Sequence, residues 1–519
     1  MSESFYMIWR NQYTRQLIRN LLCQKFIIDV NKEYLIENHR FLSVFSSKDK
    51  LDYNITIRFK GDAGDYLNIT HSNRDVINHV HLDLKLEDVS FDLNEIHDGV
   101  HKLSLKIKNK RTSVAGELSS SITYLYLCGK CPSFAQAILS NLPASLQKLE
   151  LDIHENSLSG PCIMPQSLTK LKSSIYLYYK NLKWFVVPPN KVYKNCKLYI
   201  DSFESFEWLL ENKWICSVEI DPNILNMLMT QHQLPPHVTK LCVNEDIVLD
   251  SSFLPKTLES LTCGYGTPIS HLSNLKSLTI TGDYSIKLEK GDLPASLQKL
   301  SLYYNHPLQA DVLPPHLTTL NFYTYDQPLY TNVLPPHLTT LFLNDYNQPL
   351  CVNVFPSTLT DLHLGSFNRP LDPFVLPSKL KSLSIHMKNN AQPTFPPNSL
   401  PVSLTSLTIY GFKGSFEQCQ PLDNLRNLKV DSLNPSLATL LTNVKKLDLL
   451  ETSYKDDSSG IACLYNTSIK SLHLNFCSVK TLYPNTFPST LRYLTLVNAN
   501  LESNDVIPSG CVLLKSKYL

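Results

Sequence analysis

The strongest constraint on the fold is a short repeat in the middle of the sequence. Between residues 293 and 371 the chain reads LPASLQKLSLYYNHPL, LPPHLTTLNFYTYDQPL, LPPHLTTLFLNDYNQPL and FPSTLTDLHLGSFNRPL, which share the unit LPxxLxxLxLxx(F/Y)NxPL. A period of 20 to 29 residues with an LxxLxL core is typical of leucine-rich repeats. Such a chain folds as a solenoid, in which each repeat contacts only its neighbours.

Each LxL segment predicts a short parallel strand whose two leucines face the core, because alternate side chains of a strand point to opposite sides. We call the second Leu of LxxLxL the anchor. A coil of about 22 residues leaves little room for a helix on its outer side. The sequence has 32 Pro and only 15 Gly, which favours an extended outer segment. The Asn after the aromatic residue is expected to turn inward and bond the backbone of the next coil.

The same signal continues on both sides of the clear repeats. It predicts a mainly β, leucine-rich-repeat-like parallel β-solenoid of about twenty repeats of 20–24 residues, with a short helical N-terminal cap. The frame is least certain over residues 171–218, where one spacing grows to about 27. The anchors are Val80, Leu103, Leu125, Leu149, Leu171, Leu198, Val218, Leu241, Leu261, Leu278, Leu300, Leu320, Leu341, Leu362, Leu383, Leu407, Leu428, Leu447, Leu472 and Leu494.

The motif after the strand resembles the FNIP repeat, a short leucine-rich-type unit named for Phe-Asn-x-Pro. The matching segments are residues 367–370 (FNRP), 346–349 (YNQP) and 325–328 (YDQP). The resemblance implies a solenoid with an interaction role, without catalytic residues or a defined partner. Toward both ends of the chain only LPxxLxxLxL remains. Such arrays are sometimes joined to an F-box, which would imply a receptor of a ubiquitin ligase.

The ends of the chain depart from the repeat. Residues 5–23 and 33–45 predict two amphipathic helices, and we expect residues 1–60 to form a helical leader that caps the first coil. Residues 61–500 would form the solenoid and 501–519 a C-terminal cap. The alternative for the leader is an F-box-like module that docks on an adaptor through residues 5–45. The Leu-Pro opening of an F-box is missing there.

Charge and cysteine usage narrow the function classes. Lys plus Arg number 48 and Asp plus Glu 46, so we expect no bulk attraction to nucleic acid or to a membrane. The 13 Cys are scattered singly, unlike a secreted disulfide framework. Arginines interrupt the N-terminal segment, which therefore does not resemble a signal peptide, and there is no apolar run of transmembrane length. We expect a cytoplasmic, monomeric protein.

No motif in the sequence carries chemistry. The only CxxC, Cys128 to Cys131, lacks the second ligand pair that a zinc site needs. Cys131 also falls where Asn falls in the best repeats, so a structural role is favoured. GxSxG, HExxH, P-loop and GxGxxG motifs are absent. We therefore expect neither an enzyme nor a bound cofactor or metal.

The outward positions of the strands form the candidate binding surface. In the N-terminal half they carry lysines along one edge and aspartates along the other, which either attract a partner or pair within the sheet. Farther on they turn aromatic, as interface hot spots often are, although aromatic residues also favour strands in general. The candidate partner-binding residues are Tyr303, Tyr323, Phe342, His363, His386, Tyr410, Lys148, Lys170 and Lys197.

The sequence thus predicts an interaction scaffold or recognition subunit that holds a protein partner on the concave β face. The alternative is a ubiquitin-ligase receptor that docks through the leader. The identity of the partner and its pathway are not encoded in any motif, and the outer side of the coils remains a second possible binding face.

Overall fold

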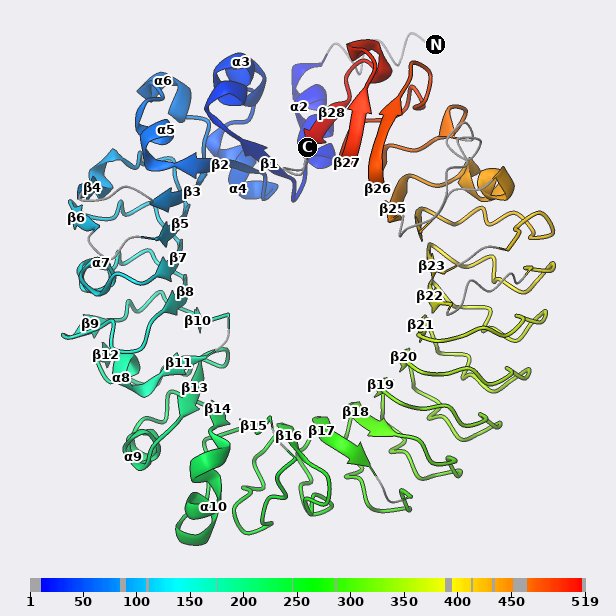
Figure 1. Ribbon diagram of the computed structural model, residues 1–519. Helices are drawn as coiled ribbons and strands as arrows, with labels where there is room; N and C mark the ends of the chain where they lie inside the picture. Colours follow the sequence, from blue (N-terminus) through cyan, green and yellow to red (C-terminus); the bar gives the residue numbers. More distant parts are fainter. Residues whose placement is uncertain are drawn as a thin grey trace. The chain divides into compact units, whose positions relative to one another are not determined.

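A computed structural model describes residues 11–84, 90–108, 112–174, 176–244, 246–284, 287–387, 394–411, 414–431, 435–450 and 464–515. The chain divides into two compact units, Met1–Cys242 (unit 1) and Val243–Leu519 (unit 2). Within each unit, short parallel strands line the inner side of the coils and the connections lie outside (Figure 1). The expected mainly β solenoid is therefore confirmed.

Unit 1 contains two sheets of short strands. The first has the order β1-β2-β3-β5-β7-β8-β10, and the second begins β11-β13-β14-β15. Two smaller pairs, β4 with β6 and β9 with β12, lie in the connections. The bounds are β1 (Ile27–Val30), β2 (Thr56–Asp62), β3 (His79–Leu84), β4 (Ser90–Asp92), β5 (Lys102–Ile107), β6 (Ser113–Ala115), β7 (Tyr124–Gly129), β8 (Lys148–Ile153), β9 (Cys162–Ile163), β10 (Lys170–Lys172), β11 (Leu177–Tyr178), β12 (Phe185–Val186), β13 (Lys197–Ile200), β14 (Ser217–Ile220) and β15 (Lys240–Cys242).

Unit 2 is more regular, because its strands follow one another in chain order through the sheet. Its outer connections are turns and irregular segments, with 3-10 turns at Pro435–Thr442 and Asn504–Val506. The strands are β16 (Ser260–Gly264), β17 (Ser277–Tyr284), β18 (Lys299–Tyr304), β19 (Thr319–Phe322), β20 (Thr340–Leu343), β21 (Asp361–Leu364), β22 (Ser382–His386), β23 (Ser406–Tyr410), β24 (Asn427–Val430), β25 (Lys446–Leu450), β26 (Ser471–Leu482), β27 (Tyr493–Leu501) and β28 (Val512–Lys515).

The anchors stand opposite one another in the sheets. Val80 pairs in register with Leu103, and the pairing continues anchor to anchor as far as Leu171. In unit 2 it runs from Leu261 to Leu494. Every one of these anchors is buried. Deleting one buried Leu side chain costs about 2–5 kcal/mol, so this column contributes strongly to stability.

The long spacing between Leu171 and Leu198 has a structural cause. Strand β10 ends the first sheet of unit 1, and the short strand β11 begins the second by pairing Leu177 with Leu198. The sequence frame therefore contains one additional short strand where it was least certain. A second unpredicted strand, β28, adds Leu513 in register with Leu494.

The expectation of extended outer segments is wrong for unit 1, where helices connect many of the strands (Figure 1). Helix α9 (Phe203–Glu211) fits into a spacing of only 20 residues, because Ser202 and Ser205 form a capping box and no Pro interrupts the segment. The Pro-rich connections of unit 2 cannot form such helices. The other outer helices are α5 (Ala63–Leu67), α6 (His71–Arg74), α7 (Pro132–Leu139), α8 (Tyr179–Leu182) and α10 (Pro222–Gln231).

The leader contains the two expected helices within its described residues, α2 (Gln12–Leu22) and α3 (Lys32–Leu42). Residues 5–10 of the expected helix lie outside the described ranges. A third helix, α4 (Ser47–Asp52), and strand β1 were not predicted. The division of the chain at residues 60 and 500 remains a proposal.

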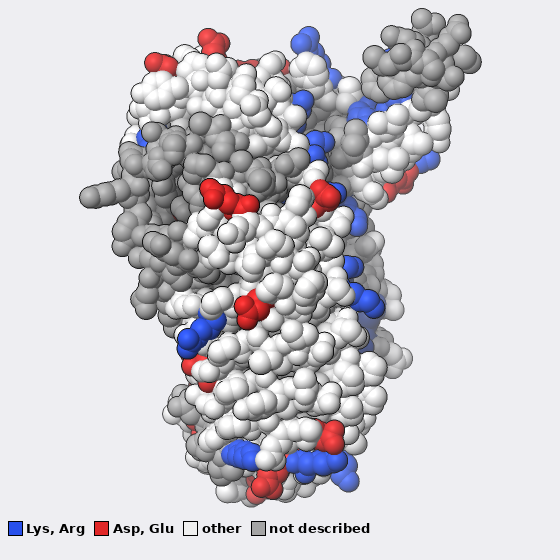
Figure 2. Space-filling view, turned by 90° about the vertical axis from the view of Figure 1, so that its right-hand side faces the viewer, with Lys and Arg blue, Asp and Glu red and all other residues white. Residues whose placement is uncertain are grey.

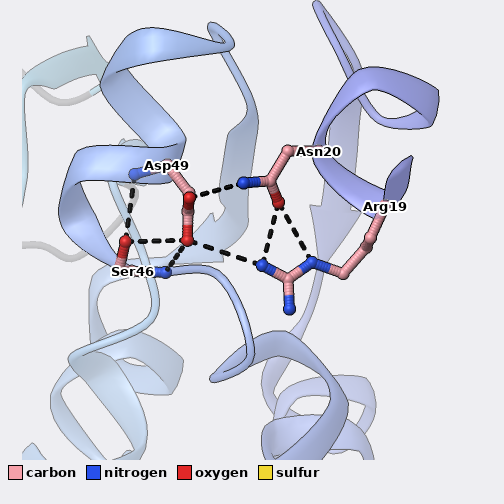
Figure 3. Close-up of polar contacts among 4 residues, drawn as sticks. All are labelled: Arg19, Asn20, Ser46 and Asp49. Atoms are coloured by element: carbon pink, nitrogen blue, oxygen red, sulfur yellow. Dashed lines mark hydrogen bonds and ion pairs between the residues drawn. The ribbon is translucent and has the colours of Figure 1, made fainter. Parts of the chain in front are cut away.

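A polar network joins α2 to α4 (Figure 3). Asn20 donates to one carboxylate oxygen of Asp49 at 2.5 Å, and Arg19 lies 3.4 Å from the other. The same carboxylate accepts from the backbone N–H and the hydroxyl of Ser46, which in turn caps the helix by accepting from the Asp49 N–H. The carboxylate of Asp49 thus ties helix α2 to helix α4.

Candidate binding surface

The six aromatic candidate residues all lie in unit 2, at outward positions of its strands. The structure groups them into a tyrosine pair and a separate series that follows the next coils. We call the whole set the aromatic surface, and it comprises Tyr303, Tyr323, Phe342, His363, His386 and Tyr410.

The tyrosine pair is a stack across neighbouring coils. The ring centroids of Tyr303 and Tyr323 lie 4.6 Å apart with 29° between the ring planes. Tyr303 is 38% exposed and Tyr323 is half-buried. The stack thus leaves more than a third of the Tyr303 surface exposed, on a backbone that the sheet already holds in place.

The second series begins at Phe342, which is also 38% exposed. Its ring contacts His363 at 5.8 Å, and His363 meets His386 edge to face at 4.9 Å. His386 meets Tyr410 in the same way at 4.6 Å. Phe342 stands on β20, opposite Asn321 of β19, and its ring contacts the following coil through His363.

The two histidines of this series have lowered pKa values. Burial lowers the pKa of His363, and the neighbouring His386 lowers it further. The pKa of His386 is lowered by burial and then by the charge of Lys429. Because both pKa values are lowered from the ordinary value for His, the neutral imidazole is favoured at both positions.

The lysine candidates lie in unit 1 and do not form one cluster. Lys148 and Lys170 are strand partners on β8 and β10, while Lys197 belongs to β13 of the second sheet. Lys148 lies 3.6 Å from Glu150, and Lys197 lies 2.8 Å from Glu219. Two of the three lysines are therefore neutralised within the sheet, whereas the Lys170 side chain is exposed.

The partners of these lysines were missed from the sequence. Glu150 and Glu219 stand one residue after their anchors, between the lysine edge and the aspartate edge. Glu150 also accepts from the Tyr124 hydroxyl at 3.0 Å and pairs with Lys172 at 2.8 Å. The outward position directly after each anchor could have revealed these pairs from the sequence. A carboxylate there reaches lysines on the same strand and on the adjacent strand.

The two cysteines of the CxxC pair differ in burial, since Cys128 is half-buried and Cys131 is buried. Cys131 is buried, and its thiol donates to the Thr112 carbonyl at 3.2 Å. Within the described ranges, no group of three or more His, Cys, Asp or Glu side chains is placed to hold a metal ion. The eleven cysteines of these ranges are all free thiols. None of the described helices has the length and apolar character needed to cross a bilayer.

Comparison with known proteins identifies the repeat. The FNIP Repeat family model matches residues 304–345 and 346–388. The chain is similar to CroV588, described as a novel circular leucine-rich-repeat protein, with 21% identity and a TM-score of 0.42 over 94% of this chain and 63% of CroV588. The chain therefore spans less than two thirds of the length of that protein.

Two further solved structures are more distant. The mouse RP105/MD-1 complex has 14% identity and a TM-score of 0.30, over 89% of this chain and 78% of the other. YopM from Yersinia enterocolitica has 16% identity and a TM-score of 0.25, over 85% and 81%. No curated protein sequence matches the chain. FNIP repeats occupy residues 304–388, and strands of the same leucine-rich type continue in register before and after them, so the chain contains FNIP repeats within a longer leucine-rich-type solenoid.

Proposed function

We propose that the chain is a protein-interaction scaffold that holds a protein partner on the aromatic surface of unit 2. The observation that carries this proposal is the Tyr303–Tyr323 stack, with Phe342 equally exposed on the next strand. Binding energy at protein interfaces concentrates in a few aromatic or Arg anchors. These anchors stand on a hydrogen-bonded sheet, so little conformational entropy is lost when a partner binds.

The lysines of unit 1 have a smaller part in this proposal. An ion pair that is already satisfied within the sheet gains little from a new partner, because exposed pairs contribute only about 0–1 kcal/mol. Lys148 and Lys197 are in that situation. Lys170 remains exposed and would mainly speed the approach of an acidic partner. The free thiols support a reducing compartment such as the cytoplasm.

Capture of partners by the full chain tests the proposal. The variant carries Tyr303→Ser, Tyr323→Ser and Phe342→Ser, three changes that leave the buried core untouched. A matched control carries Tyr330→Ser, Val352→Ser and Val402→Ser, which remove exposed apolar side chains from the connections of the same unit. We expect the first variant to lose the proteins that wild type captures and the control to keep them. Retention of every partner by the first variant would refute the proposal.

The leader supports a second candidate function, adaptor docking by an F-box-like module. A cap is expected to bury its apolar side chains, yet Tyr13 and Leu21 of α2 are 71% and 53% exposed. Ile36 and Phe41 of α3 are also exposed. Full-length Tyr13→Ser/Leu21→Ser should lose ubiquitin-ligase components if the leader is a docking module. Wild-type capture that contains no such components would remove this candidate.

A further inference from the structure

A row of exposed cations runs across the C-terminal coils of unit 2. Each cation stands two residues before the buried anchor of its coil, at the edge where the strands begin. The anchors concerned are those from Leu383 to Leu494. We call this set the basic row, and it comprises Lys381, Arg426, Lys445, Lys470 and Arg492, all of them exposed.

Backbone hydrogen bonds place these residues directly beside one another. The N–H of Lys445 donates to the carbonyl of Arg426 at 2.8 Å, and the N–H of Lys470 donates to that of Lys445 at the same distance. Arg492 continues the series by donating to Lys470 at 2.8 Å. Between Lys381 and Arg426 the equivalent position is Thr405, the one uncharged member of six successive coils. The alignment is therefore set by the sheet and not by flexible side chains.

The charges of the basic row are not compensated within the described residues. None of its five cations forms an ion pair there, in contrast to Lys197 of unit 1, which pairs with Glu219. The adjacent position in each coil is also without a carboxylate, since it is occupied in order by Ser382, Ser406, Asn427, Lys446, Ser471 and Tyr493.

Figure 2 shows Lys and Arg side chains one above another along one edge of these coils, while the rest of the face is largely uncharged. Like charges on adjacent strands repel each other, so the row lowers the stability of the free protein. An anionic ligand would remove that repulsion. Unpaired cations aligned along the N-terminal ends of the strands would therefore favour the binding of an anionic ligand.

We propose that the basic row binds an extended acidic segment of a protein partner. Five coil steps of about 4.8 Å give a strip about 24 Å long. A β-extended peptide rises about 3.4 Å per residue, so about seven residues would lie along it. Arg426 and Arg492 each donate from Nη1 to two carbonyls of their own coil, and the Nε and Nη2 groups would bind a carboxylate in a bidentate manner. The proposal deepens the proposed function by giving the charge of the partner, but it concerns different residues.

The surroundings of the row favour a polypeptide over a nucleic acid. Single-stranded nucleic acid is bound by cations together with aromatic side chains on which bases stack. Of the six side chains beside the row, only Tyr493 is aromatic. The whole chain carries a formal charge of only +2, whereas nucleic-acid-binding domains usually have a broad basic surface. The strip therefore supplies ion pairs for one extended chain and little else.

Fluorescence anisotropy with full-length protein tests the proposal. The probe is a labelled twelve-residue peptide of alternating Glu and Thr, compared with the same peptide containing Gln in place of Glu and with an oligothymidylate of equal net charge. The variant carries Arg426→Gln, Lys445→Gln and Lys470→Gln. The control carries Lys256→Gln, Lys287→Gln and Lys290→Gln, which remove the same charge from exposed positions elsewhere in unit 2. Circular dichroism verifies that both fold.

We expect the acidic peptide to bind at low salt, the Gln peptide not to bind, and the variant to weaken binding at least tenfold. The control should stay within twofold of wild type, and the variant should show a smaller salt dependence. Equal affinity of variant and wild type, or no binding of the acidic peptide, overturns the proposal. Tighter, row-dependent binding of the oligothymidylate would assign the strip to nucleic acid instead. The aromatic triple variant should bind the acidic peptide normally, so this test and that of the proposed function can fail separately.

Discussion

The side-chain oxygen of Asn347 accepts a hydrogen bond from the backbone N–H of Asn368, one coil further along, at 2.8 Å. The same bond joins Asp326 to the N–H of Asn347 and Asn305 to the N–H of Asp326, each at 2.8 Å. The Asn of the FNIP motif therefore ties each coil to the next through the backbone. Beside this ladder the motif aromatics form parallel rings in the core, with Tyr325 6.3 Å from Tyr346.

Removing one acceptor from this ladder should loosen two coils. Asn347→Leu leaves the half-buried N–H of Asn368 without its acceptor and is expected to cost about 1–3 kcal/mol. Asn347→Asp, which keeps the acceptor, is the control. Hydrogen exchange of the Asn368 amide and urea unfolding report the two effects. Asn368→Leu is a poorer test, because within the described residues the Asn368 side-chain oxygen has no hydrogen-bond partner. Equal amide protection in the Leu and Asp variants would contradict the ladder.

The turn that precedes each Leu-Pro contains a second repeated feature with one exception. Asp311, Asn332, Asn353 and Phe374 stand at successive coils with φ of 64°, 66°, 66° and 65°. Asp and Asn tolerate this left-handed conformation, whereas a bulky residue is strained in it. Phe374 is also 66% exposed, so it gains little from burial.

Phe374→Asn should therefore stabilise the protein by about 1 kcal/mol, because the backbone strain is relieved and no core contact is lost. The urea midpoint of unfolding measures the gain. The reverse change, Asn353→Phe, should lower stability by a similar amount at the equivalent turn. If Phe374→Asn were destabilising, the aromatic side chain would have to make a contact worth more than the strain.

Much of the strand pattern could be read from the sequence because it depends on local periodicity. The anchors, their spacing and the motif Asn follow from the repeat, and the sheets pair these anchors in register. The left-handed turn could have been found in the same way, from the Asn or Asp two residues before Leu-Pro or Phe-Pro. The outer helices of unit 1 were not predicted, because a coil length of about 22 residues suggests an extended outer segment for every coil. The distribution of Pro along the chain distinguishes the coils better.

The candidate surface was only partly predictable. Outward positions follow from alternation, and the Tyr303–Tyr323 stack follows from coil spacing. Which neighbouring ring Phe342 contacts does not follow from alternation or spacing, and in the structure it is His363 of the following coil. His79 occupies the outward position before its anchor Val80, yet it is only 9% exposed, because its ring lies over the neighbouring coil and contacts the Ser104 hydroxyl at 3.2 Å.

The buried His79 should make unit 1 sensitive to mild acid. Burial, and then the charges of Arg58 and Lys102, lower the pKa of His79 to about 3. Below the ordinary His pKa of about 6.5 the unfolded chain binds a proton that the folded chain does not. Stability should therefore be lost as the pH falls from about 6.5 toward 3, by up to about 1.4 kcal/mol per pH unit. His79→Gln should lose less over this range in urea unfolding, and parallel pH profiles of the two proteins would contradict the assignment.

The carboxylate of Asp49 is the point at which helix α2 can be released selectively. Burial alone would raise the pKa of Asp49, but hydrogen bonds from Ser46 and Asn20 and the charge of Arg19 lower it below the ordinary value. Asp49→Ala removes the reciprocal half of the capping box of α4 together with the contacts to α2, whereas the Ser46 hydroxyl can still cap the helix. We expect amide exchange to increase in residues 12–22 and to stay unchanged in strands β5, β7 and β8.

Asp49→Asn separates charge from geometry in this network. An amide oxygen can still accept from Ser46, but it carries no charge for Arg19, so protection of α2 should be intermediate between wild type and Asp49→Ala. The wild-type helix should also loosen in acid. Because the pKa of Asp49 is lowered in the folded protein, this carboxylate stabilises the fold at pH values above the ordinary Asp pKa, and the stabilisation is lost as the pH falls through the folded-state pKa. If α2 kept its protection in Asp49→Ala, apolar packing and not this carboxylate would hold the leader helix. That result would be unexpected, because Tyr13 and Leu21 of α2 are exposed.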